Sequence, residues 1–305
     1  MTYFVIKLLE IKPTRKMKKR FSKILFLTTF VVSFTASAQE REPVKSNIQT
    51  YTPSKLLDKG QWDVKFFNNL YTETKGSYNG ITSDKERETY FTSTLDLFTG
   101  VSDNNRLNIG LLLEYRSNVI NGKSATAAFD FKNDENSRNG LSSFAPALKW
   151  QPIENIGNFS IQSAFHIPII SNESDANGVY LDQTAYTFQN RFFYDYTVEN
   201  GNWQLFTELN TEYNFGDSTS FANNTIVLAP GVFMSYFPSN TTTILGFVQH
   251  YQRFGDFTQN FTALGFGGKY QLNSTLNLEI LFSKFVRGSD TGLGQSFNIG
   301  LRALF

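Results

Sequence analysis

The 305-residue sequence contains no cysteine, few charged residues and almost no net charge. Without cysteine, a disulfide framework and cysteine-based metal or redox sites are excluded. Charged residues make up only 18% of the chain, against about a quarter in a typical soluble domain. The formal net charge of +1 provides no basic surface for nucleic acid, so no nucleic-acid partner is expected.

Long apolar runs are also missing, although aromatic residues are abundant. The mean hydropathy of −0.29 is too polar for a bundle of membrane-spanning helices. The sequence nevertheless contains 31 Phe and 14 Tyr. Many aromatics, few charges and a polar average suit a protein with one face toward lipid and one toward water. A transmembrane β-barrel has this property, because alternate residues of each strand point to lipid and to lumen.

The N-terminal region has the three parts of a secretory signal peptide. A basic segment begins at Met17, an apolar run extends from Ile24 to Phe34, and Ala36-Ser37-Ala38 is a small-residue cleavage pattern. The apolar run is shorter than the about 20 residues that span a bilayer. We therefore expect a signal peptide over residues 1–38, with Met17 as the natural start, and a periplasmic lead-in over residues 39–60.

The remainder, residues 61–305, alternates between apolar and polar positions with the period of a β-strand. In 106–119, for example, Leu107, Ile109 and Leu111 fall on one face, whereas Glu114 and Arg116 fall on the other. Strands are expected over residues 61–74, 88–101, 105–119, 141–153, 158–170, 184–197, 202–215, 223–237, 241–253, 258–272, 275–287 and 293–305. The alternation of 241–253 is weak, and the facing of that strand stays open.

The connections between these strands alternate between short and long. Short turns are expected at 102–104, 154–157, 198–201, 238–240 and 273–274. Longer loops are expected at 75–87, 120–140, 171–183 and 216–222, with tighter connections on the same side at 254–257 and 288–292. Outer-membrane barrels have short periplasmic turns and longer extracellular loops. The predicted fold is therefore all-β, a transmembrane antiparallel up-and-down barrel of about twelve strands. A closed barrel also leaves no backbone group unpaired in lipid.

Aromatic residues near the strand ends suit the interfacial girdles of such a barrel. Those expected in the girdles are Trp62, Tyr90, Tyr115, Trp150, Tyr196, Trp203, Tyr236 and Tyr270. The chain ends on Phe305 after a strand with aromatic or apolar residues at alternate positions. This ending resembles the C-terminal signal by which the assembly machinery recognises outer-membrane barrels, so that machinery is an expected partner.

A second resemblance covers most of residues 39–305. It rests on Lys59-Gly60-Gln61-Trp62, on Phe165-His166-Ile167-Pro168, and on Phe192-Phe193-Tyr194-Asp195-Tyr196 before Asn200-Gly201. These segments are similar to outer-membrane transporters of the phenol meta-pathway type. The resemblance implies a barrel and a transport role, and it supplies no catalytic residues.

Charged residues within the strands are expected to face the lumen, because a Lys or Arg facing lipid at mid-membrane costs roughly 2–4 kcal/mol. Their role is either a stiffening network of salt bridges or a polar lining that orients a solute. Lys65 and Asp96 belong to this set. The candidate solute-binding residues of the lumen are Arg106, Glu114, Arg116, Lys149, His166, Arg191, Asp195, Glu208, Glu212, Lys269 and Arg302.

The predicted function is an outer-membrane channel or transporter for small hydrophilic or aromatic solutes, embedded in outer-membrane lipids. A plugged barrel with partner-binding extracellular loops is the alternative. A membrane hydrolase based on His166 is a third, disfavoured hypothesis. The phospholipase pattern has Ser two residues after the His, where this chain has Pro168. No metal or cofactor is expected, and neither the solute nor the oligomeric state follows from the sequence.

Overall fold

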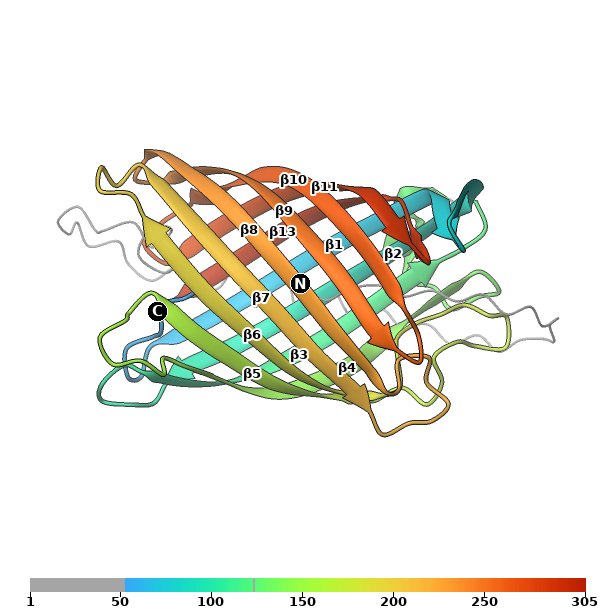
Figure 1. Ribbon diagram of the computed structural model, residues 1–305, viewed down its shortest axis with the longest axis horizontal. Coiled ribbons are helices and arrows are strands. Elements are labelled where there is room, and N and C mark those ends of the chain that lie inside the picture. Colours follow the sequence, from blue (N-terminus) through green and yellow to red (C-terminus); the bar gives the residue numbers. More distant parts are fainter. Residues whose placement is uncertain (1–52, 123) are drawn as a thin grey trace.

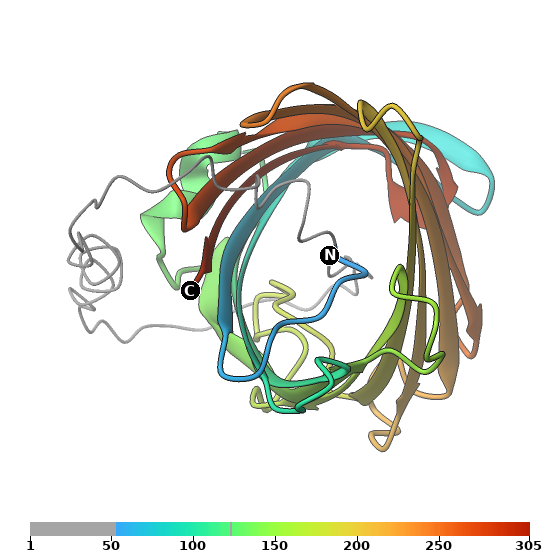
Figure 2. The ribbon, with the colours of Figure 1, turned by 90° about the vertical axis from the view of Figure 1, so that its left-hand side faces the viewer.

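The structure is a computed structural model that describes residues 53–122 and 124–305. The expected signal peptide, the start at Met17 and the lead-in up to residue 52 lie outside these described residues. Residues 53–60 precede the first strand and run across one mouth of the barrel (Figure 2). Within the described part of the chain, no helix is long and apolar enough to cross a membrane.

The strands form one closed antiparallel sheet, which confirms the predicted barrel (Figure 1). Each long strand pairs with its neighbours in sequence, and β13 pairs with β1 to complete the ring. Among the described residues there are twelve long strands and the two-residue β12. They are β1 (Trp62–Tyr78), β2 (Ile81–Gly100), β3 (Leu107–Val119), β4 (Ser137–Trp150), β5 (Phe159–Pro168), β6 (Tyr186–Thr197), β7 (Trp203–Phe215), β8 (Thr225–Ser239), β9 (Thr242–Gly255), β10 (Gln259–Gln271), β11 (Leu276–Ser289), β12 (Thr291–Gly292) and β13 (Gln295–Leu304).

Alternation along each strand sorts side chains between the two faces of the wall. In β8, Ile226, Leu228 and Val232 are exposed on the outside, whereas Val227 and Ala229 are buried on the inside. Large apolar side chains are exposed on the outer face around most of the ring. Within the described residues, pairing of β13 with β1 closes the ring, and only the β1–β2 hairpin extends beyond it. Both features are those of a barrel that spans a lipid bilayer.

The connections at the two ends of the barrel differ in length, as predicted for most of them. Short turns join β2 to β3, β4 to β5, β6 to β7, β8 to β9 and β10 to β11 at one end. This end is periplasmic in barrels of this class, and the opposite end is extracellular. The extracellular connections include residues 120–136, which carry the short helix η1 (Ala125–Asp130), and residues 169–185.

One predicted loop is wrong. Residues 75–87 extend β1 and β2 instead of forming a loop, and only Asn79 and Gly80 turn. Both have positive φ, 49° and 76°, as a tight hairpin turn that matches the strand twist requires. Residues 75–87 are mostly polar, so they lack the apolar–polar alternation from which the other strands are predicted. The Asn79-Gly80 pair is nevertheless a signal for a hairpin turn.

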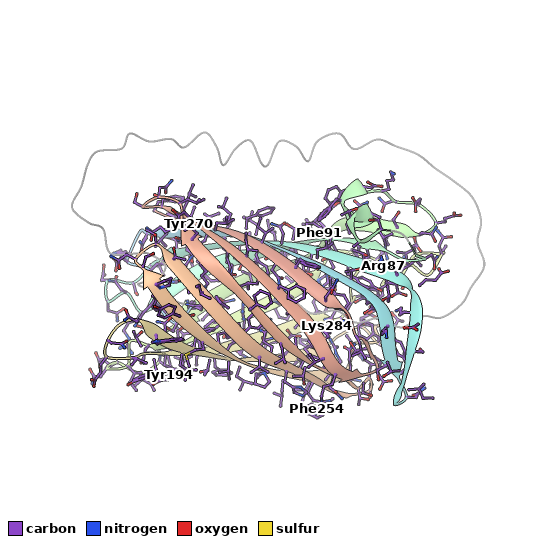
Figure 3. The ribbon with its side chains drawn as sticks, turned by 90° about the horizontal axis from the view of Figure 1, so that it is seen from above. Arg87, Phe91, Tyr194, Phe254, Tyr270 and Lys284 are labelled. Atoms are coloured by element: carbon purple, nitrogen blue, oxygen red, sulfur yellow. The ribbon has the colours of Figure 1, made fainter. Side chains whose placement is uncertain are left out.

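The expected aromatic girdles are present, with one exception. Trp62, Trp150 and Trp203 are exposed on the outer wall near the periplasmic end. Tyr194 and Tyr270 lie at the same end (Figure 3). Tyr90, in contrast, points into the lumen and is only 1% exposed, so its assignment to a girdle was wrong. Its register partner Tyr71 is likewise inside.

Candidate functional site

The inner face of the barrel holds all the candidate residues named from the sequence. Arg106 lies at the periplasmic rim, where it donates to the Gln151 carbonyl over 2.9 Å. The others lie on inward positions of their strands: Glu114, Arg116, Lys149, His166, Arg191, Asp195, Glu208, Glu212, Lys269 and Arg302. The structure brings them together along one lumen, and their role in solute binding stays a prediction.

Three ion pairs line the lumen between its middle and its periplasmic end. Arg191 contacts Glu208 at 2.8 Å, and Lys269 contacts Glu279 at 2.9 Å. Arg302 pairs with Asp63 at 2.6 Å between β13 and β1. Glu279 and Asp63 were missed from the sequence although both alternate in phase with other inward residues. Paired charges of both signs leave a strongly polar wall without a large local excess of one sign.

A row of four phenylalanines lies beside the Arg191–Glu208 ion pair on the inner wall. Phe193, Phe206, Phe233 and Phe247 lie on β6 to β9, with successive ring centroids 6.0, 5.4 and 5.2 Å apart. The Arg191 guanidinium lies over the Phe193 ring, 5.1 Å from its centroid. We call these four residues the phenylalanine row. The polar lining expected from the sequence therefore covers only part of the lumen wall.

A second set of rings lies nearer the extracellular end. Tyr90, Tyr71, Phe285, Phe261 and Tyr251 form the extracellular aromatic row, and Phe261 stacks on Phe285 at 4.1 Å. The Tyr71 hydroxyl donates to Glu73 over 2.6 Å, and Tyr90 donates to Glu88. Lys85 lies between these two carboxylates, 2.8 Å from each. The hydroxyls are thus satisfied while the ring faces stay apolar.

A cavity of about 140 Å³ lies between the charged wall and the phenylalanine row. Lys65 and Asp96 line one part of it, and Phe206 and Phe233 line another. Glu208 lies next to Phe206 on β7. Pro53, from the segment before β1, also lines this cavity. The cavity presents polar and aromatic surfaces to the same small volume.

The extracellular end of the lumen is covered by loops that fold inward. Arg116 binds Glu114 at 2.5 Å and reaches Asp182 of the β5–β6 loop at 3.3 Å. The Asn118 amide donates to the carbonyls of Tyr180 and Leu181 at 2.8 and 3.0 Å. Residues 169–185 are therefore anchored to the inner face of β3 by polar contacts that are shielded from solvent.

Glu173 connects this loop with the β7–β8 loop, residues 216–224. Its carboxylate accepts hydrogen bonds from the Ser220 hydroxyl and from the backbone N–H groups of Phe221 and Thr184. Burial raises the pKa of the Glu173 carboxyl above its ordinary value, although these hydrogen bonds act in the opposite direction. Phe221 in turn packs edge-on against Tyr180. The two loops form one cover, which we call the extracellular cover.

The periplasmic end is narrowed by residues 53–58. Leu57 is 2% exposed and packs against Phe98 and Leu304 inside the barrel. The Leu57 N–H donates to the Asn108 side chain over 3.2 Å, and the Lys149 ammonium donates to the Lys55 carbonyl over 2.9 Å. We call this stretch the periplasmic plug. Sequence alternation could not reveal it, since the segment forms no strand.

The two histidines occupy opposite faces. His166 points inward and contacts the Gln189 amide oxygen at 3.4 Å. His250 lies on the outer face of β9 and contacts the Thr262 hydroxyl at 2.9 Å. Asp182 lies near His166 but pairs with Arg116, so it does not orient the imidazole. Within the described ranges, no cluster of His, Cys, Asp and Glu could hold a metal ion.

Comparison with known proteins finds likeness in structure alone. No model of a known protein family matches the sequence, and no curated protein matches it. An outer-membrane channel from Pseudomonas putida F1 is similar with a TM-score of 0.64 and 13% identity, covering 87% of this chain and 100% of that one. The β domain of the Bordetella autotransporter BrkA has a TM-score of 0.54 and 12% identity, covering 80% and 99%. The chain therefore has the fold of the twelve-stranded outer-membrane β-barrels, as the resemblance seen in its sequence implied.

Proposed function

We propose that the protein is an outer-membrane channel for small organic solutes that combine a planar apolar part with a polar group. The observation that carries this proposal is the two-sided lining of the central cavity. Lys65 of β1 and Asp96 of β2 lie on one side. The phenylalanine row of β6 to β9 lies on the other, beside the Arg191–Glu208 ion pair. Polar groups that fix orientation within a mainly apolar surface are typical of small-molecule sites.

The width of the barrel supports passage. Eight strands leave almost no lumen, and sixteen to eighteen leave an aqueous channel. Twelve strands leave an interior that side chains narrow without filling, as the central cavity of about 140 Å³ shows. The extracellular cover and the periplasmic plug narrow the lumen at its two ends. We therefore expect both segments to move when a solute passes.

The ion pairs around the cavity suit a solute that carries hydrogen-bonding groups. Each pair keeps donors or acceptors directed at the lumen, and Arg191 is also held over an aromatic ring. A planar solute can stack on a ring of the phenylalanine row in the same way as the Arg191 guanidinium stacks on Phe193. The lining thus offers successive, exchangeable contacts instead of one deep site, which favours conduction.

Partner binding by the extracellular loops is the second candidate function. The β1–β2 hairpin extends beyond the other strands, and its turn residues are exposed. In contrast, the loops at residues 169–185 and 216–224 are hydrogen-bonded to each other through Glu173. The hairpin is therefore the segment that such a partner would meet. The exposed C-terminal Phe305 at the periplasmic end suits recognition by the assembly machinery, which we include in the proposal.

Solute uptake by proteoliposomes tests the channel. We expect aromatic solutes with a polar group to enter faster than aliphatic solutes of equal size and charge. Phe233→Ala removes a ring from the phenylalanine row and should reduce this preference several-fold. Val232→Ala, on the outer face of the same strand, is the matched control. The proposal fails if no solute enters even when the periplasmic plug and the extracellular cover have been weakened by substitution.

A further inference from the structure

The β3–β4 loop folds outward over the wall of the barrel instead of inward over the lumen (Figure 2). The Ser117 hydroxyl, on the outer face of β3, donates to the Ala128 carbonyl over 2.7 Å. Ala128 is fully buried, and Phe91 on the outer face of β2 is only 8% exposed beneath the loop. The rings of Phe129 and Phe91 meet edge-on at 5.1 Å. The loop is thus attached to a surface that would otherwise face lipid.

Beside this loop, the outer wall is hollowed into a groove of about 470 Å³. Phe129, Phe91 and Leu70 form one side, and the opposite side comes from β13, β11 and β10. Asn68 lies at its floor and is the one outward polar side chain among the lining residues. We call this hollow the outer groove. The remaining outward side chains that line it are Phe266, Ile280, Phe282, Phe297 and Ile299.

The sheet register places a polar row directly above the outer groove. Leu70 pairs with Phe297, which pairs with Phe282, so these three residues lie in one cross-strand row. Two residues nearer the extracellular end, Thr72 pairs with Gln295, which pairs with Lys284. All of these positions face outward, because each lies two residues from an outward neighbour.

Two cations lie in this polar row. The Arg87 guanidinium donates to the Thr72 hydroxyl over 2.8 Å, so its charge lies at the β1 position of the row. The Lys284 ammonium donates to the Leu293 carbonyl over 2.9 Å and is otherwise exposed. Thr72 and Lys284 are two strands apart, which separates their backbones by about 10 Å. Figure 3 shows Arg87, Phe91 and Lys284 on the half of the barrel that carries the long loops.

The depth of the polar row matches the outer membrane interface. Trp62 marks the periplasmic girdle on the outer face of β1, ten residues before Thr72. Ten steps of about 3.3 Å, tilted by about 40°, raise Thr72 roughly 25 Å above Trp62. The apolar band of outer-membrane barrels is also about 25 Å tall. Arg87 and Lys284 therefore lie at headgroup level, and the outer groove lies among the acyl chains below them.

We infer that the outer groove and the cations above it bind a phosphorylated glycolipid of the outer leaflet, of the lipid A type. One acyl chain lies in the outer groove against Phe129, and the phosphate contacts Arg87 and Lys284. Basic side chains at the membrane surface attract anionic headgroups, and apolar surface binds the chain. The β3–β4 loop supplies one wall, so the lipid contacts a shaped site and not only the smooth outside of the barrel.

Native mass spectrometry of the full-length protein tests this inference. The protein is reconstituted in phosphatidylcholine nanodiscs that contain a minor fraction of either lipid A or phosphatidylglycerol. We expect the released protein to retain lipid A in preference to both other lipids. Arg87→Gln together with Lys284→Gln should lower that retention by at least about tenfold, since each cation near a membrane surface contributes about 1 kcal/mol. Phe129→Ala should lower it several-fold through the acyl chain.

Lys75→Gln is the matched control, because Lys75 is an exposed cation on the same hairpin that lies nearer its tip and pairs with Asp84. It should leave retention unchanged. Heat-modified gel mobility verifies that every variant is folded. Equal retention of lipid A by the Arg87 and Lys284 double variant would overturn the inference. Equal retention of phosphatidylglycerol and lipid A by the wild type would overturn the choice of glycolipid.

Discussion

The two closures of the lumen are built from different interactions. The extracellular cover is anchored by charged and hydrogen-bonded groups, above all Arg116 with Glu114 and Asp182. The periplasmic plug combines hydrogen bonds to its backbone with the buried side chain of Leu57, which lies in an apolar cluster with Phe98 and Leu304. Removing one partner of a buried ion pair strongly destabilises the structure around it, because the other charge stays buried without compensation. Truncating a buried apolar side chain costs free energy in proportion to the volume that is removed. We therefore expect the extracellular cover to respond to charge and pH, and the periplasmic plug to respond to side-chain volume.

The largest effect is expected from Arg116→Gln. This change leaves Glu114 and Asp182 without their cation, and loss of one member of a buried pair typically costs roughly 3–5 kcal/mol. Glu114 is held in β3, so the β5–β6 loop with Asp182 should leave the lumen to reach water. We expect the open probability in planar bilayers to rise at least about tenfold, because each 1.4 kcal/mol changes an equilibrium tenfold.

Lys132→Gln is the control for this variant. Lys132 pairs with Asp130 in the outward-folded β3–β4 loop, so its removal takes away a cation without touching the extracellular cover. Limited proteolysis supplies a second readout, since a released loop should be cleaved within residues 169–185. If Arg116→Gln leaves both conductance and cleavage unchanged, Arg116 does not hold the extracellular cover.

A smaller effect is expected from Leu57→Ala. Truncation of a buried leucine costs about 2–5 kcal/mol, and the lower part of that range applies because Leu57 packs in a small cluster near the end of the barrel. The plug retains the polar contacts of Lys55 and Ser54 with Lys149 and Gln151. We expect a several-fold rise in open probability. This factor should multiply that of Arg116→Gln, because free-energy changes at distant sites add and the two closures are at opposite ends.

Leu57→Ile keeps the volume and should behave like the wild type. Conductance of the Arg116→Gln and Leu57→Ala double variant then decides whether the two closures are independent. A double variant no more open than Arg116→Gln alone would show that the periplasmic plug does not limit passage.

The strands and their facing could be predicted because one physical constraint controls them. Lipid requires an apolar outer face, so Leu107, Ile109 and Leu111 alternate visibly with inward polar residues. The alternation disappears where the lumen-facing side chains are apolar as well. In β9, Leu245 and Phe247 face the lumen while Ile244 and Val248 face outward, so the alternation vanishes. The weak pattern of 241–253 thus marked the apolar part of the lumen.

The aromatic lining and the closures could not be predicted from the pattern of single strands. Tyr90 was assigned to a girdle because a strand-end tyrosine suits either face, and only its register with Tyr71 places it inside. The contacts of Leu57 with Leu304 and of Asn118 with Leu181 join segments far apart in the sequence. No local period encodes such contacts. The outward fold of the β3–β4 loop could not be predicted for the same reason.

The smallest effect, and the sharpest test of the comparison, is the pH dependence of the extracellular cover. Burial raises the pKa of Glu173 when the cover is closed, whereas an exposed Glu173 in a released loop has the ordinary value near 4.5. The closed state therefore binds this proton more tightly, and its stability increases as pH falls through the raised pKa, until the ordinary value is reached. We expect the wild-type open probability to decrease a few-fold on acidification. Glu173→Gln should reduce this response, and Leu57→Ala should retain it. If Glu173→Gln keeps the full pH response, Glu173 is not the group that makes the extracellular cover sensitive to pH. If Leu57→Ala loses the response, the two ends of the lumen are coupled.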